Sequence, residues 1–80
     1  MHELGLTQDL VDLVTAKAVA EGVAKVISVR LMVGEFAGVE PDSVSFCFEV
    51  VSRGTVAENA RLEIERVPGR EFRVVSMEVD

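Results

Sequence analysis

The 80-residue sequence has no tryptophan, no tyrosine, one cysteine and two prolines. The single cysteine, Cys47, cannot form an internal disulfide, which indicates a cytoplasmic protein. Hydrophobic residues make up 49% of the chain, enough for the core of one small domain. Because only four residues are aromatic, that core must be mostly aliphatic.

Basic residues are also scarce, with 8 against 14 acidic ones and a net charge of -6. Such a surface repels phosphate backbones and anionic lipids, so nucleic-acid and membrane partners are not expected. A cation or a basic protein is a better match. The apolar runs are too short to span a bilayer, and a helical pattern from residue 3 leaves no room for a signal peptide.

Apolar residues recur at helical spacing from Glu3 to Glu21, and Gly22 then favours a stop. The predicted buried face comprises Leu6, Leu10, Leu13, Val14 and the stem of Lys17, widened by Leu4, Val11 and Ala18. A second helix is predicted to begin near Pro41, between the acidic Glu40 and Asp42, and to end at Gly54. Its predicted buried stripe comprises Val44, Cys47, Phe48 and Val51.

Three segments alternate with a period of two, which is typical of strands: 26–33, 60–67 and 70–79. The first has one fully apolar face: Ile27, Val29, Leu31 and Val33. In the last, Val75, Met77 and Val79 alternate, and Phe72 is out of phase with them. This mismatch predicts a bulge or a frayed start near Arg73.

The order α-β-α-β-β predicts an α+β two-layer sandwich, with two helices on one face of a three-stranded mixed sheet. The strand–helix–strand unit should form a right-handed parallel crossover, and the last two strands should be antiparallel.

The sequence begins with Met1-His2-Glu3, and an N-terminal amine followed by histidine can chelate a metal. The amine, the deprotonated His2 amide and the imidazole can bind one ion in a plane, which suits Ni(II) or Cu(II). Glu3 could complete the set. A histidine at a terminus is more often a solvated residue without a role, and Glu3 also suits the positive end of a helix dipole.

The segments MHEL, VRLMVGEFAGVEPDSVSFCFEVVSRGT, LEIERVP and GREFRVVSMEVD together resemble the HypA/HybF family of nickel metallochaperones for [NiFe]-hydrogenase maturation. The resemblance runs from Met1 to Asp80 with one interruption. It implies that Met1, His2 and Glu3 carry nickel ligands, and that Glu40 lies near the ion. From the sequence alone, Glu40 is equally an N-cap-like carboxylate at a helix start.

The interruption falls at Pro68-Gly69, where the family carries a zinc domain held by two CxxC pairs. This sequence has no CxxC, so it predicts a single nickel-binding domain over residues 1–80, without zinc. We expect Pro68-Gly69 to close a hairpin with a wider loop or strained pairing, because Pro-Gly favours a type II turn. A short, strained turn at Pro68-Gly69 also favours a homodimer, including one in which two chains exchange their last strands.

The leading hypothesis is a nickel metallochaperone domain whose partners, by resemblance, are the GTPase HypB and the hydrogenase large-subunit precursor. Urease is the other client that the resemblance implies. The alternative is a metal-free interaction module that uses the exposed sheet face: Arg30, Met32, Arg61, Glu63 and Glu65. An enzyme is not expected, because there is one histidine, no plausible triad and no phosphate loop.

Overall fold

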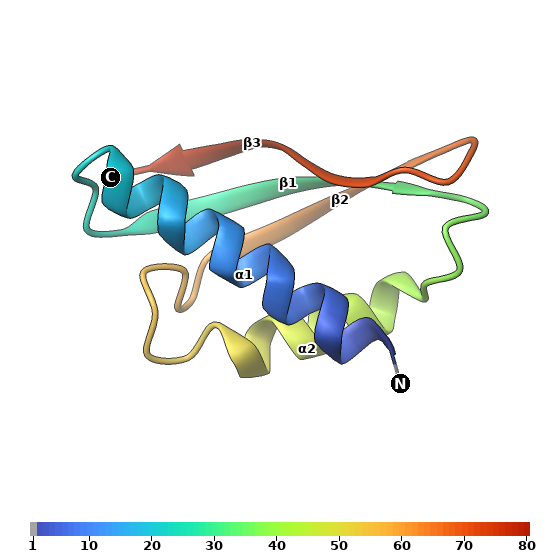
Figure 1. Ribbon diagram of the computed structural model, residues 1–80, viewed down its shortest axis with the longest axis horizontal. Helices are drawn as coiled ribbons and strands as arrows, with labels where there is room; N and C mark the ends of the chain where they lie inside the picture. Colours follow the sequence, from blue (N-terminus) through green and yellow to red (C-terminus); the bar gives the residue numbers. More distant parts are fainter. Residues whose placement is uncertain (1) are drawn as a thin grey trace.

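The computed structural model describes residues 2–80 and confirms the α+β fold, with two helices on one face of a three-stranded sheet (Figure 1). The elements in chain order are α1 (His2–Ala20), β1 (Val26–Gly34), α2 (Pro41–Val51), β2 (Arg61–Val67) and β3 (Phe72–Val79). All five were predicted, and most bounds agree within two or three residues. Neither helix in this part of the chain is long and apolar enough to cross a membrane.

The strand order is β2-β1-β3, so the first strand lies in the centre. β1 is parallel to β2 and antiparallel to β3. β2 and β3 therefore run in opposite directions, as expected, but they do not pair with each other. The expectation of a hairpin at Pro68-Gly69 is wrong, because the most apolar strand takes the position between them and the connection passes the end of β1 near Gly34.

α1 packs on the sheet through a face rotated from the predicted one. Its buried residues are Thr7, Leu10, Val11, Val14 and Ala18. Leu13, predicted to be buried, is 58% exposed, and Leu4 is 48% exposed. Thr7 can be buried because its hydroxyl donates a hydrogen bond to the Glu3 carbonyl at 2.6 Å. A pattern of apolar residues cannot identify a threonine that is buried because its hydroxyl is hydrogen-bonded within the helix.

The predicted stop of α1 at Gly22 is confirmed. Gly22 has φ +69°, a conformation that favours glycine. The Val23 amide donates to the Ala18 carbonyl at 2.9 Å and the Gly22 amide to the Val19 carbonyl at 3.1 Å. This pair of bonds is a Schellman motif, which satisfies two carbonyls at the helix end.

α2 buries Val44, Cys47 and Phe48, as predicted, and Val51 packs against the same core. Pro41 occupies the first turn. The helix ends at Val51, three residues before the predicted stop, and the Ser52 amide donates to the Phe48 carbonyl at 3.0 Å.

β3 places Phe72, Val74 and Met77 against the core, whereas Val75 is 42% exposed and Val79 is 37% exposed. The predicted phase of Val75 and Val79 is therefore wrong. Arg30 pairs with Ser76 but Leu31 pairs with Val74, which leaves Val75 as an extra residue. The irregularity lies at Val75 and not near Arg73, because this shift lets Phe72 and Met77 face the same layer.

β1 carries a matching irregularity at its start. Val26 pairs with Val79 and Ser28 with Glu78, so Ile27 is the extra residue. Val26 is consequently fully buried, and Ile27 is only partly buried. The rest of the predicted apolar face, Val29, Leu31 and Val33, is fully buried under the helices.

Candidate metal centre

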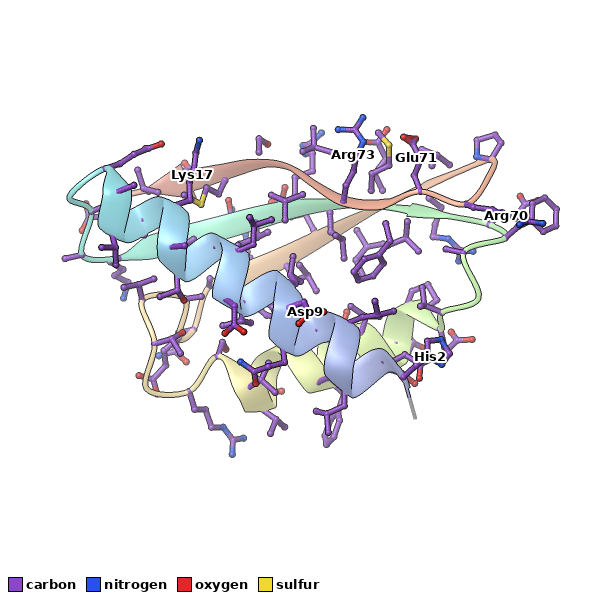
Figure 2. The ribbon with its side chains drawn as sticks, in the orientation of Figure 1. His2, Asp9, Lys17, Arg70, Glu71 and Arg73 are labelled. Carbon is purple, nitrogen blue, oxygen red and sulfur yellow. The ribbon has the colours of Figure 1, made fainter. Side chains whose placement is uncertain are left out.

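The start of α1 lies against the loop that joins β1 to α2. Figure 2 shows His2 at the first turn of α1, close to the point where this loop enters α2. Two hydrogen bonds join the segments: His2 Nε2 with the Gly38 carbonyl, and the Glu40 amide with the Glu3 carboxylate. The fold thus brings His2 and Glu3 together with Glu40, from 37 residues away along the chain.

The His2 ring is exposed but oriented. Its side chain is 62% exposed, and Nε2 lies 2.6 Å from the Gly38 carbonyl oxygen. A carbonyl oxygen can only accept, so Nε2 must carry the hydrogen. The other ring nitrogen, Nδ1, keeps its lone pair in the neutral ring. Metal-binding histidines are oriented in this way, by donating the second ring N–H to a carbonyl or carboxylate.

Glu3 is more enclosed, with its side chain 15% exposed. Its Oε2 accepts a hydrogen bond from the Glu40 amide at 3.3 Å and lies 3.8 Å from His2 Nε2. Hydrogen bonding by its own backbone amide lowers the pKa of the Glu3 carboxyl below its ordinary 4.5, although desolvation opposes the shift. The hydrogen bond from the Glu40 amide and the positive charge of the His2 ring, when that ring is protonated, lower this pKa further. Glu3 is therefore a carboxylate at neutral pH.

Glu40 occupies the N-cap position of α2, as the sequence indicated, but its side chain makes no cap hydrogen bond. The residue is exposed and contacts the site through its backbone amide. The structure thus gives Glu40 a role that neither interpretation anticipated: its N–H, and not its carboxylate, holds Glu3 in place.

Met1, the first of the predicted ligands, lies outside the described residues. Within residues 2–80, no three histidine, cysteine, aspartate or glutamate side chains converge in a manner that could hold a metal ion. An ion at the start of α1 would therefore need backbone nitrogens. The amides of the first turn can provide such nitrogens only after losing their protons, and this loss breaks no hydrogen bond within the helix because these N–H groups have no carbonyl partner there.

The sheet face opposite the helices carries the residues of the alternative hypothesis. Arg30 and Arg61 lie 3.6 and 3.4 Å from Glu63, and Arg61 lies 3.8 Å from Glu78. All of these side chains are at least 43% exposed. This face is therefore a network of solvated ion pairs whose charges already compensate one another.

Sequence reasoning missed an apolar groove between the two helices, beside the start of α1. It has a volume of about 390 Å³ and is lined by Leu4, Asp42, Ser43, Phe46, Cys47 and Val50. Phe46 is 68% exposed and Val50 is 39% exposed. The available signal was the helical position of Phe46, which lies outside the predicted stripe of α2.

Comparisons with known proteins identify the family of this chain. A family model described as "Hydrogenase/urease nickel incorporation, metallochaperone, hypA" matches residues 1–79. The chain therefore belongs to the HypA family. The match extends to both sides of the 67–71 connection.

Curated relatives named hydrogenase maturation factor HypA give the same result. The chain is 49% identical to the Geobacter sulfurreducens protein over 70 residues, which cover 88% of this chain and 61% of that one. It is 54% identical to the Streptomyces avermitilis protein over 71 residues, covering 88% of this chain and 54% of that one. The chain thus spans about 54–61% of the length of these two relatives.

Proposed function

We propose that this chain binds Ni(II) at the start of α1, through Met1, His2 and Glu3 with Glu40 beside them, and delivers the ion for [NiFe]-hydrogenase maturation. The observation that carries the proposal is the contact between His2 Nε2 and the Gly38 carbonyl. This contact fixes the tautomer, and it leaves Nδ1 as the ring nitrogen with an available lone pair.

Nδ1 is the nitrogen that a chelate at this position requires. With the His2 amide nitrogen as a second donor, it closes a six-membered ring around the ion, and the Met1 amine closes a neighbouring five-membered ring. Nitrogen donors in one plane suit Ni(II). The Glu3 amide or carboxylate supplies the remaining position.

Glu3 and Glu40 act together in this proposal. The Glu3 carboxylate remains ionised beside the ion, and the Glu40 amide limits its movement. Groups that orient metal ligands commonly change metal affinity by about 10- to 100-fold. Glu40 therefore contributes by holding Glu3 through its backbone amide, and its exposed carboxylate is on the same loop residue that contacts the site.

Delivery requires that another protein reach the ion and replace the ligands. The exposed His2 ring and the position of the site at the molecular surface meet this requirement. The family description names hydrogenase and urease as the enzymes that receive nickel. We propose that the partners of this chain are HypB and the hydrogenase large-subunit precursor, in the cytoplasm, with urease as the other client. We propose one nickel-binding domain over residues 1–80, without a zinc site at 68–69, and no catalytic step.

Isothermal titration with Ni(II) tests the proposal. The parent should bind one ion, and His2→Ala should lower the affinity by at least about 100-fold, since it removes a ligand and not only its orienting partner. Asp9→Ala, an exposed acidic residue farther along α1, is the matched control and should bind as the parent does. Equal nickel binding by His2→Ala and the parent would overturn the proposal.

Acetylation of the N-terminal amine separates this function from a metal-free interaction module on the sheet face. Acetylation converts the amine into an amide without a basic lone pair, so nickel binding should be lost. A protein contact made by Arg30 and Glu63 should be unchanged. Retention of full nickel affinity would show that the amine is not a ligand.

A further inference from the structure

The chain crosses itself closely where β1 leaves the sheet. Three successive amides, of Gly34, Glu35 and Phe36, donate to carbonyls of the connection between β2 and β3. The bond lengths are 2.6 Å to Glu71, 2.7 Å to Val67 and 2.7 Å to Gly69. The 67–71 connection is therefore held to the first residues of the loop that follows β1.

Gly34 is required at this crossing for steric reasons. A Cβ atom at position 34 would lie 2.3 Å from the Gly69 carbonyl oxygen and 2.7 Å from the Glu71 amide nitrogen. Both neighbours are backbone atoms, so they cannot move aside as a flexible side chain would. Any larger residue must displace the connection, the loop or both.

The other end of the same loop contacts the proposed nickel site. Four residues after Gly34, the Gly38 carbonyl meets His2, and two residues later the Glu40 amide meets Glu3. The segment 34–40 is thus bonded to the 67–71 connection at one end and to α1 at the other. Figure 2 shows Arg70 of the connection and His2 at the same end of the molecule.

We propose that Gly34 and the 67–71 connection are positioning elements of the nickel site. They fix the path of residues 34–40 and thereby set the Gly38 carbonyl against His2 and the Glu40 amide against Glu3. A displacement of the connection, although it touches no ligand, lowers nickel affinity. This inference rests on the proposed function for its nickel readout, but the contact that it describes is also measurable without metal.

The first test lengthens the connection while leaving Gly34 unchanged. An insertion of Gly-Ser-Gly between Pro68 and Gly69 should weaken Ni(II) binding by about tenfold, the effect expected when a group that orients a ligand is lost. The matched control is the same insertion between Arg53 and Gly54. That turn bonds within itself, from Thr55 to Ser52 and from Glu58 to Thr55. Its nickel affinity should match that of the parent.

A second pair of variants tests the crossing itself. Gly34→Ala should weaken nickel binding, whereas Gly5→Ala should not, because a Cβ at Gly5 meets nothing within 4 Å. Thermal unfolding of each variant shows whether it folds. If Gly34→Ala does not fold, the insertion pair still decides the question.

Amide hydrogen exchange of the metal-free protein separates this inference from the proposed function. In the insertion at Pro68-Gly69, exchange should accelerate at Phe36 and also at Glu40, and the control insertion should accelerate neither. Faster exchange at Phe36 with unchanged exchange at Glu40 would refute the coupling, even if the parent binds nickel. If the parent does not bind nickel but exchange at Phe36 and Glu40 accelerates together in the insertion variant, only the proposed function is refuted.

Discussion

At the end of the sheet where β1 begins, buried side chains close the fold: Ala18, Val26 and Ala57 are all fully buried. At the end where β1 finishes, the loop at 35–40 is held by backbone hydrogen bonds and by Ala37 and Val39, which are only partly buried against the core, and its only aromatic residue, Phe36, is 67% exposed. Figure 1 shows both ends, with the 35–40 loop and the 67–71 connection on the side where the N-terminus lies.

The two ends of the sheet therefore differ in their contribution: the first contributes mainly to the stability of the fold, and the second carries the proposed nickel site. Side chains buried at the first end contribute apolar burial to the free energy of unfolding. At the second end, backbone bonds fix the path of the chain, and the side chains stay available to an ion or a partner protein. Regions with few buried apolar contacts also open more easily, as ligand exchange requires.

The largest effect on stability should come from Val26→Ala at the buried end. The change removes two fully buried methyl groups and should lower the free energy of unfolding by about 2 kcal/mol. Urea denaturation measures the loss. Nickel affinity of the folded variant should equal that of the parent, and a parallel loss of affinity would contradict the separation of the two ends.

A smaller loss is expected from Gly22→Ala at the same end. Alanine at φ +69° is strained, and the Schellman motif depends on this conformation, so the cost should be about 1 kcal/mol. Gly5→Ala, within α1, is the control and should leave stability equal or slightly higher. A Gly22→Ala variant as stable as the parent would show that α1 ends differently in solution.

Phe36→Ala tests the other end of the sheet, in the 35–40 loop beside the proposed nickel site. Because its ring is mostly exposed, the free energy of unfolding should change by less than about 0.5 kcal/mol. The same denaturation experiment checks this value. A loss as large as that of Val26→Ala would mean that the ring is buried in solution.

The smallest effect should be the contribution of Glu3 to acid stability. Because the fold lowers the pKa of the Glu3 carboxyl, its contribution is fully present above the unfolded value near 4.5 and is lost as the pH falls through the lower folded value. Denaturation midpoints between about pH 5 and about pH 2 should therefore fall less steeply in Glu3→Gln than in the parent. Parallel slopes would show that Glu3 is not hydrogen-bonded as described.

Local pattern predicted the elements well because each depends on neighbours within a few residues. Pro41, Gly22 and the alternation around Leu31 were sufficient for the helices and the central strand. The predicted face of α1 was partly wrong because burial of Thr7 depends on a bond to the Glu3 carbonyl, which a hydrophobic period does not include.

Long-range geometry could not be read from the sequence. Pro68-Gly69 has the composition of a hairpin turn, but the neighbour of each strand depends on which strand buries most apolar surface. The bulge at Val75 follows from pairing with β1. At the site, His2, Glu3 and Glu40 could be named, but the part played by the Gly38 carbonyl and the Glu40 amide required coordinates.

The electronic spectrum of the nickel-loaded protein tests the central claim most directly. Planar coordination by the amine, the His2 amide and Nδ1 gives a yellow, diamagnetic species at neutral pH. A pale, paramagnetic species would instead indicate six-coordinate nickel with oxygen ligands, and would contradict a chelate built on the first residues of α1.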